Sequence, residues 1–530
     1  MKRIFLTAAL AFACAAGVHA VDYSNPVMAG DYPDPSVIRV GTEYWAVTTS
    51  SEWGPQFPLL LSHDLVNWKL AGTVFPKRPE WSVANYWAPE ITEYKGRYYV
   101  YYVGRKKGGP LAVAVATADK PSGPYTDHGE LVAQPAGSID PVAVDDEKGE
   151  RYLIWKEDGN SRKQPTILWM QRLNENATKL LDQPKELIRN DTAWEGAVIE
   201  GPFVLKRDNW FYLFYSGNGC CGSGCNYAVG VARSHSLHGP YEKYARNPIL
   251  AGNATWKCPG HGSIVRTERS RYFLMYHAYS VKDSVFTGRQ ALLDEVTFRS
   301  DGWPVINDGK GPSTTAPMPY DTVQKKAELT FGDNFSGTEL APGWQWPAGD
   351  EPRHKVEREN LILSPSRKTN DLIGAVLARC TTSSDYSAQT KTGQLEPGTF
   401  AGIAAFGDAA NAMGLVVNSS GRLLLWLRQK GSHQILSESS IPKHRDVWLR
   451  LVARDGHRFQ FFARGADDQP WMPIGKDVEG QHLPPWDRNV RVALTVGGVE
   501  GALGRFDTFL MMTRSREPVG ADTQVPAKSQ

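Results

Sequence analysis

The pattern of apolar and polar positions repeats five times between residues 34 and 276. Each copy begins with an acidic residue or a histidine beside a proline or glycine, runs into a short apolar stretch, turns, and enters an aromatic-rich strand. The copies begin at Asp34, Glu90, Asp140, Glu200 and His261, and their aromatic strands at Tyr44, Tyr98, Tyr152, Phe211 and Tyr272. Their first aromatic residues are 54, 54, 59 and 61 residues apart. Repeats of this size are typical of propeller blades, each a small sheet that buries its faces against its neighbours. The sequence therefore predicts a five-bladed β-propeller over residues 21–316.

A different pattern follows the repeat, which stops near Trp303. Residues 317–328 are predicted to be a linker. From 329 to 515 apolar and polar positions alternate in strands such as 422–427, 447–453 and 490–496, without the blade signature. This region is predicted to be a separate β-sandwich of the jelly-roll or concanavalin-like kind, which makes the whole chain all-β. The polar residues 516–530 are predicted to be a disordered tail.

The first 20 residues have the physical pattern of a secretory signal. Lys2 and Arg3 precede an apolar run that reaches Ala16, and small residues occupy the expected cleavage positions before Val21. A lipid-modified Cys14 is the alternative processing. We expect a secreted or periplasmic protein with no membrane attachment once the signal is removed. The formal net charge is +2 without a long basic run, which argues against nucleic acid as a partner.

Four of the remaining cysteines cluster in or near one repeat, at Cys220, Cys221, Cys225 and Cys258. Export favours an oxidising compartment, so we expect one or two disulfides that restrain a loop there. A zinc site is the alternative, but adjacent cysteines do not match the usual spacing of paired ligands.

The acidic residues that begin the repeats are the strongest indication of chemistry. Taken alone, Asp34 and Asp140 each have an ordinary explanation, because Asp before Pro favours a turn. They occupy the same position as Glu200 in different repeats, however, so a propeller would bring all three to one funnel. Repulsion and desolvation there would raise at least one pKa, leaving a protonated acid beside ionised partners. Glycosidic bond cleavage needs that combination. Trp87 is a candidate to contact a sugar, with buried packing as the alternative.

Four motifs in this order resemble glycoside hydrolase family 43. The motifs are Gly30-Asp31-Tyr32-Pro33-Asp34-Pro35-Ser36, Tyr86-Trp87-Ala88-Pro89-Glu90, Ser138-Ile139-Asp140-Pro141 and Ile199-Glu200-Gly201-Pro202. The resemblance implies a five-bladed propeller that cleaves arabinose- and xylose-containing polysaccharides with inversion. It makes Asp34 the general base, Glu200 the general acid, and Asp140 the residue that orients the acid and raises its pKa. The downstream region resembles the β-sandwich that many members append.

Two further positions follow from the resemblance. Gly288-Arg289-Gln290 resembles the arginine that contacts substrate near the modulating carboxylate. His261 resembles an axial histidine that helps to hold a calcium or sodium ion largely surrounded by water, although calcium prefers oxygen ligands. No cofactor is expected for the chemistry itself.

We therefore expect a secreted inverting exo-glycosidase that removes α-L-arabinofuranosyl units from plant cell-wall arabinan or arabinoxylan. A β-xylosidase of the same family is the first alternative, and a non-catalytic carbohydrate-binding propeller is the second. In a third, the sandwich binds glycan through Trp344, Trp346, Trp471 and Trp486 while the propeller supports it, although core packing explains such residues equally well. Three loops are expected to set the depth of the pocket: 51–58, 218–226 and 280–288.

Overall fold

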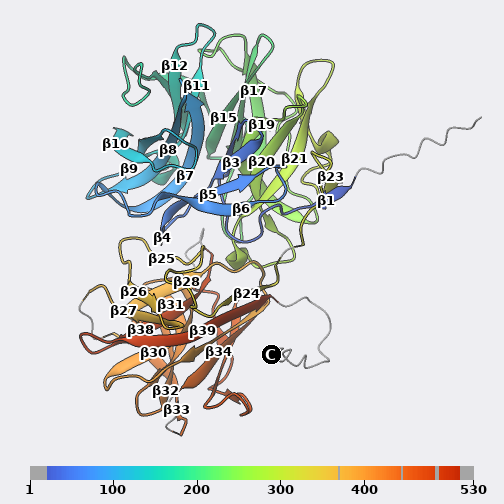
Figure 1. The fold of residues 1–530 in the computed structure, drawn as a ribbon. Helices are drawn as coiled ribbons and strands as arrows, with labels where there is room; N and C mark the ends of the chain where they lie inside the picture. The colour runs from blue at the N-terminus through green and yellow to red at the C-terminus, as the bar shows by residue number, and fades with distance from the viewer. Residues whose placement is uncertain (1–20, 327, 368–370, 443–445, 484–488, 514–530) are drawn as a thin grey trace, which may run out of the picture.

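The computed structural model describes residues 21–326, 328–367, 371–442, 446–483 and 489–513, and they form two β-rich domains (Figure 1). The expected signal segment 1–20 and the tail 516–530 lie outside the described residues. Within the described ranges there is no α-helix, and no helix is long and apolar enough to cross a membrane. The helical segments there are the 3-10 turns η1 (Gly159–Arg162), η2 (Ala193–Glu195), η3 (Val285–Thr287) and η4 (Asn307–Gly309).

The first domain contains five antiparallel sheets of four strands each, and the strands of each sheet follow one another in the chain except that β4 lies between the second and third strands of the first sheet. Blade one comprises β2 (Ser36–Val40), β3 (Glu43–Val47), β5 (Gln56–Ser62) and β6 (Lys69–Phe75), and blade two β7 (Ser82–Tyr94), β8 (Arg97–Lys106), β9 (Leu111–Ala118) and β10 (Thr126–Val132). Blade three comprises β11 (Ser138–Asp145), β12 (Arg151–Glu157), β13 (Ile167–Arg172) and β14 (Lys185–Arg189). Blade four comprises β15 (Ile199–Arg207), β16 (Trp210–Gly217), β17 (Ala228–Ser234) and β18 (Glu242–Lys243), and blade five β19 (Trp256–Arg266), β20 (Tyr272–Ser280), β21 (Gln290–Phe298) and β22 (Pro304–Ile306).

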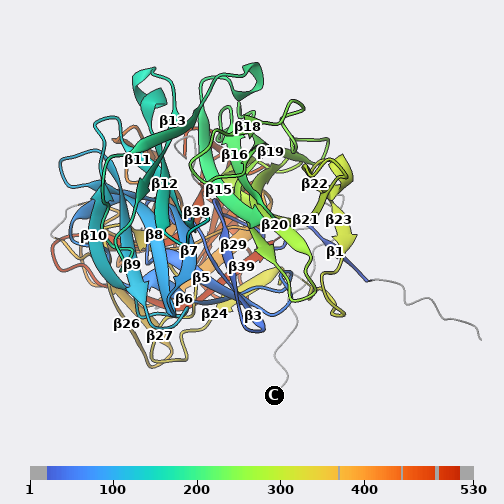
Figure 2. The same ribbon diagram turned by 90° about the horizontal axis from the view of Figure 1, so that it is seen from above.

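The five sheets close into a ring, which confirms the predicted propeller. The first strands β2, β7, β11, β15 and β19 contact one another in this order, and β19 also contacts β2. Figure 2 shows the blades arranged around this centre, seen from above. A short sheet of β1 (Asp22–Ser24) and β23 (Thr315–Pro317) joins the two ends of the domain. Beside it, the side chain of Asn25 donates to the carbonyl of Leu293 and to Oγ of Ser313.

The aromatic repeats are the second strands of the blades. Adjacent residues of a strand point to opposite faces of its sheet, so an apolar run can fill two interfaces at once. In blade two, Tyr102 packs with Phe57 against blade one, whereas Tyr101 packs with Trp155 against blade three. Both tyrosines are fully buried. This two-sided burial explains why these strands read as continuous apolar and aromatic runs rather than as alternating ones.

The second domain is a sandwich of two antiparallel sheets. One contains β24 (Thr330–Asp333), β26 (Arg353–Glu357), β27 (Asn360–Ser364), β29 (Tyr386–Thr392), β34 (Val447–Arg454), β35 (Arg458–Arg464), β36 (Met472–Pro473), β37 (Val478–Glu479) and β39 (Gly504–Thr513). The other contains β28 (Ala375–Arg379), β30 (Thr399–Asp408), β31 (Asn411–Asn418), β32 (Arg422–Gln429), β33 (Ser432–Ser440) and β38 (Arg491–Gly498). Their facing side chains, such as Leu361, Leu415 and Leu449, form one buried core. The three example strands predicted from the alternating pattern correspond to β32, β34 and β38.

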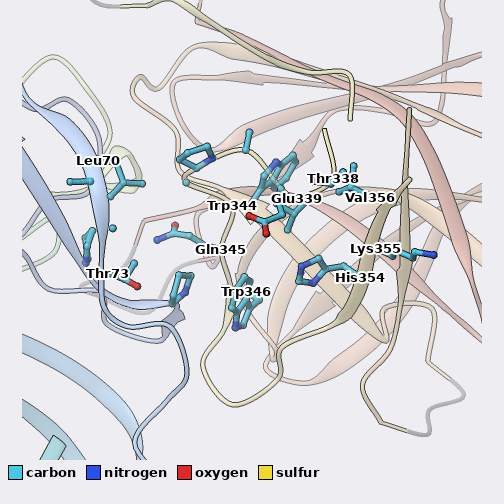
Figure 3. A pocket seen from close by; sticks show the side chains of 18 residues that line it. Leu70, Thr73, Thr338, Glu339, Trp344, Gln345, Trp346, His354, Lys355 and Val356 are labelled. Carbon is cyan, nitrogen blue, oxygen red and sulfur yellow. The ribbon is translucent and has the colours of Figure 1, made fainter. Parts of the chain in front are cut away.

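The sandwich packs directly against blade one. β4 (Trp53–Gly54) pairs with β25 (Trp346–Pro347), and the ring of Trp53 meets that of Phe406 edge-on at 5.8 Å. Beside this contact lies a cavity of about 590 Å³. Leu70 and Thr73 border it on one side and His354 on the other (Figure 3). Loop 51–58, expected to shape the substrate pocket, therefore forms part of the domain interface instead.

The tryptophans proposed as a glycan platform have different environments. Trp344 is 3% exposed and belongs to the sandwich core, where its Nε1 donates to Asp333 at 2.8 Å. Trp346 pairs with β4 of the propeller, and the guanidinium groups of Arg450 and Arg464 lie 3.9 and 4.6 Å from the centroid of the Trp471 ring. Trp486 lies outside the described residues. Packing therefore accounts for Trp344.

Candidate active site

All six site residues proposed from the sequence line one cavity of about 410 Å³ in the propeller. They are Asp34, Trp87, Asp140, Glu200, His261 and Arg289. Asp34 lies two residues before the first strand of blade one, and Asp140 and Glu200 each lie in the first strand of their own blade. The repeat therefore brings together side chains that are far apart in sequence.

Irregularities in the first strands aim these side chains. The pairing register shifts next to Glu90, Asp140, Glu200 and His261, which marks a β-bulge in each of blades two to five. Bulges turn a side chain out of the regular alternation. Asp34, Asp140 and His261 have φ angles of 53°, 56° and 37°, in the left-handed region that costs a non-glycine residue free energy. Three equivalent positions of the ring thus have a strained backbone conformation, which is common at functional sites.

Asp34 is held as a carboxylate. Its Oδ1 accepts from Nη1 of Arg289 at 3.0 Å, and its Oδ2 accepts from Oγ1 of Thr49 at 2.7 Å. Burial alone would raise the pKa of Asp34, but the charges of Arg289 and His261 outweigh it and hold this pKa well below its usual range. His277 accepts from the backbone N–H of Asp34 through Nδ1 at 3.2 Å. Burial and Arg289 lower the pKa of His277 to about 4, so its ring is neutral at neutral pH.

Glu200 is paired with a buried lysine. Nζ of Lys156 lies 2.6 Å from Oε2 of Glu200 and 3.1 Å from Oδ1 of Asp158, and its side chain is 1% exposed. The hydroxyl of Tyr227 donates to Oε1 of Glu200 at 2.9 Å. Burial works to raise the pKa of Glu200, but Lys156 and Tyr227 stabilise the carboxylate and lower this pKa overall.

The raised pKa belongs to Asp140 instead. Burial, together with the charge of Glu200, raises the pKa of Asp140 to about 6, although His261 opposes the shift. Oδ2 of Asp140 accepts from the backbone N–H of Gly201 at 2.8 Å, which ties it to the residue after Glu200. The expectation that one carboxyl would have a raised pKa is confirmed. The expectation that this carboxyl is Glu200 is wrong for the free protein, because Lys156 stabilises the carboxylate of Glu200 and lowers its pKa.

His261 lies between two carboxylates. Its Nδ1 is 3.5 Å from Oδ1 of Asp34 and 3.8 Å from Oδ2 of Asp140, and its backbone N–H donates to Oγ of Ser216. Within the described residues no three His, Cys, Asp or Glu side chains are arranged to hold a metal ion. One imidazole does not make the oxygen-rich shell that calcium prefers. The axial ion thus stays a prediction, and the mechanism proposed for the carboxylates does not depend on it.

Two disulfides shape one wall of the cavity. Cys220 bonds to its neighbour Cys221, and Cys225 bonds to Cys258. The predicted pinning of this loop is confirmed, and disulfide formation excludes these four thiols as zinc ligands. Cys220 and Cys221 both line the cavity, so loop 218–226 does shape the pocket as expected.

Several contact residues were missed from the sequence. Thr49, Ser216 and His277 each stand five positions after the first aromatic residue of a repeat, where each contacts a site residue. A polar residue at this fixed offset in an aromatic strand is a signal that would have found them. Lys156 stands one position earlier in its own repeat, where a lysine ends an apolar run.

A propeller with a carboxylate-lined cavity fits the class of glycoside hydrolases, whose reaction uses paired carboxyl groups. The profile described as glycosyl hydrolases family 43 matches residues 23–304, more than half of the chain. The chain belongs to this family. A second profile, described as the beta xylosidase C-terminal concanavalin A-like domain, matches residues 332–485.

Similar proteins carry related names. The chain is 30% identical to a xylan 1,3-beta-xylosidase of a Vibrio species over 59% of this chain and 62% of the relative. It is 28% identical to xylosidase/arabinosidase 43B of Humicola insolens over 56% of this chain and 57% of the relative, so it spans about three-fifths of the length of both. The crystal structure of the family 43 protein BlXynB from Bacillus licheniformis superposes with a TM-score of 0.81 at 25% identity, covering 93% of this chain and 100% of that one.

Proposed function

We propose that the protein hydrolyses terminal pentosyl units with inversion, with Asp34 as general base, Glu200 as general acid and Asp140 as the residue that orients the acid. The proposal is carried by one observation: these three carboxyls, whose pKa values are shifted in different directions, line one cavity together with Trp87 and Arg289. Arginine can donate both to a carboxylate and to a sugar hydroxyl.

The base step uses the carboxylate of Asp34. In an inverting enzyme it takes a proton from a water molecule while the oxygen of that water attacks the anomeric carbon. Arg289 and Thr49 each use one oxygen of Asp34 as an acceptor, which fixes the plane of the carboxylate. Since a carboxylate offers about four acceptor sites, others are left for water.

The acid step uses the carboxyl of Glu200. It gives its proton to the glycosidic oxygen as the bond to the leaving group breaks, and it becomes a carboxylate. Lys156 and Tyr227 stabilise that carboxylate, so they strengthen Glu200 as an acid and at the same time narrow the pH range in which it holds its proton. After each turnover, Asp34 releases its proton to solvent and Glu200 takes up a proton from solvent.

The acid assignment is tested with leaving groups. Glu200→Ala should lose much more activity on a poor leaving group, such as an oligosaccharide, than on an activated aryl glycoside, because acid assistance matters less when departure is easy. Equal losses on both would exclude Glu200 as the acid. NMR of the first-formed anomer tests inversion, and a retained configuration would overturn the assignment of Asp34 as a base.

The proposal extends to the identity of the sugar. We infer a pentosidase that accepts α-L-arabinofuranosyl units, as expected from the sequence, and β-xylosyl units, as the names of the two relatives suggest. Plant arabinan, arabinoxylan and their oligosaccharides are the proposed substrates. Paired 4-nitrophenyl arabinofuranoside and xyloside assays, followed by product analysis on the polymers, decide between the two sugars and between exo and endo action.

Export is part of the same proposal. The signal-like segment 1–20 supports it, and so do the two disulfides, which form in oxidising compartments. N-terminal sequencing of the protein recovered from the periplasm or medium should begin near Val21. Recovery only from the cytoplasm, with the segment intact, would contradict it.

A further inference from the structure

The sandwich domain places a buried arginine beside the active-site segment of the propeller. Arg491, the first residue of β38, is 2% exposed. Its Nη2 lies 3.5 Å from Oδ2 of Asp31, whose side chain is 6% exposed. Nε of Arg491 donates to Oε1 of Gln345 at 2.8 Å, and the guanidinium lies 4.3 Å from the centroid of the Trp53 ring. A propeller carboxylate is thus paired with a cation of the other domain.

Asp31 in turn contacts the segment that carries Arg289. Its Oδ1 accepts from the backbone N–H of Arg289 at 3.4 Å, and the N–H of Tyr32 donates to the carbonyl of Arg289 at 2.9 Å. A Cβ at Gly288, whose φ is +99°, would lie 2.6 Å from Oδ1 of Asp31, so the two segments are in tight contact. The side chain of Arg289 continues to Asp34. Four charges therefore alternate from the sandwich to the cavity, in the order Arg491, Asp31, Arg289 and Asp34.

We propose that Arg491 is a positioning residue for the general base. By compensating the charge of Asp31, it allows the guanidinium of Arg289 to stay paired with Asp34. The proposal rests on the role of Asp34 given above. The ionisable groups facing Asp31 are Arg491, Arg289, Asp34, the thiol of Cys380 and the hydroxyl of Tyr32. Burial raises the pKa of Asp31, and Arg491 is the largest charge that opposes this shift, so loss of Arg491 raises this pKa further. Above that pKa, the unpaired Asp31 carboxylate attracts Arg289 away from Asp34, because opposite charges interact strongly where water is excluded. The effect of losing Arg491 is therefore measured on the alkaline side of the pH–rate profile.

Holding the domains together does not by itself account for this pair. The interface also contains the β4–β25 pairing, the bond from Nδ2 of Asn489 to the carbonyl of Thr287, and the bond from the N–H of Ser284 to Oγ of Ser384. A buried ion pair is frequently no more stabilising than apolar residues of the same volume. Arg491 is linked to the general base through only two intervening residues, Asp31 and Arg289, and this link indicates a role in placing that base.

The test compares Arg491→Met with the double variant Asp31→Asn/Arg491→Met in the full chain on a 4-nitrophenyl glycoside. We expect Arg491→Met to lower kcat by up to about 100-fold, the loss that a misplacement of about 1 Å can cause, with a smaller change in KM. An asparagine at position 31 carries no charge to attract Arg289, so the double variant should recover most of kcat. Ser384→Ala, which removes another interdomain contact, serves as the control and should keep the wild-type kcat.

A double variant as slow as Arg491→Met would overturn the proposal. That result would mean that the loss of activity comes from the missing side chain of Arg491 and not from the uncompensated charge of Asp31. A kcat of Arg491→Met within twofold of wild type would also overturn it. If Arg491→Met does not fold, Arg491→Lys and Arg491→Gln replace it: only the lysine should retain kcat, and equal values would refute the role of charge. Asp34→Ala is measured in parallel. An active Asp34→Ala would refute the proposed base itself, whereas with an inactive one the Arg491 variants alone decide whether the arginine positions that base.

Discussion

The buried pair of Lys156 and Glu200 gives the sharpest prediction. Replacing Lys156 by Met keeps much of the volume of the side chain but removes the ammonium 2.6 Å from Glu200. Lys156 lowers the pKa of Glu200, so its loss should raise this pKa and keep Glu200 protonated to higher pH. The alkaline limb of the kcat/KM profile, which reports the free enzyme, should therefore move upward.

The same change should be costly for stability. Removing one partner of a buried pair costs about 3 to 5 kcal/mol, because the other charge is left without compensation. At roughly 2 °C per kcal/mol for a domain of this size, the melting temperature should fall by about 6 to 10 °C near neutral pH. The loss should shrink in acid. A lowered carboxyl pKa contributes stability above the unfolded value of 4.5, and this contribution disappears as the pH falls through the folded pKa.

Lys106→Met is the matched control. Lys106 lies at the same 2.6 Å from Glu130, but the two side chains are 45% and 40% exposed, against 1% and 13% for Lys156 and Glu200. Exposed pairs contribute about 0 to 1 kcal/mol. Calorimetry and pH–rate profiles of both variants decide the matter. A Lys156→Met protein that melts like Lys106→Met, with an unmoved alkaline limb, would refute the electrostatic reasoning.

Two other changes have measurable consequences. Burial raises the pKa of Glu90 to about 7 from 4.5, so the contribution of its protonated form to stability is present below pH 4.5 and is lost as the pH rises to 7. Glu90→Gln should therefore be up to about 3 kcal/mol more stable than wild type at pH 8 and equal to it at pH 4. The same difference in stability at both pH values would contradict an effect of Glu90 ionisation. Trp87→Ala should raise KM about tenfold because it removes a wall of the cavity. Trp169 belongs to the same apolar cluster but lies outside the cavity, so Trp169→Ala should only lower the melting temperature. Similar KM values for the two variants would exclude a substrate contact by Trp87.

The sequence was enough to predict the ring and its three carboxylates because both follow from one repeated unit. The aromatic run at Tyr98 recurs wherever a blade has two neighbours to pack against, and the acidic position at Asp140 recurs where a first strand bulges. Blade packing and site chemistry share the same period, so a single pattern indicates both.

What remained hidden depends on pairs that no period relates. Lys156 is an ordinary polar residue in its strand until β12 and β15 are placed side by side, and it then reverses the expected direction of the pKa of Glu200. Asp31 and Arg491 are separated by 460 residues and belong to different domains. Nothing local to either residue marks it as half of a buried pair, since only the packing of the sandwich against the propeller brings them together.

The way the ring is closed has a consequence for rearranging the gene. Every blade is a contiguous stretch of chain, and the ends of the ring are joined by β1 and β23 rather than by a blade that shares strands from both ends. Opening the chain in the connection between β10 and β11, and linking the native ends of the propeller, would therefore cut none of the five blade sheets. Whole blades are modules that can be permuted or exchanged between relatives, provided that each donor blade brings the side chain that its position contributes to the cavity.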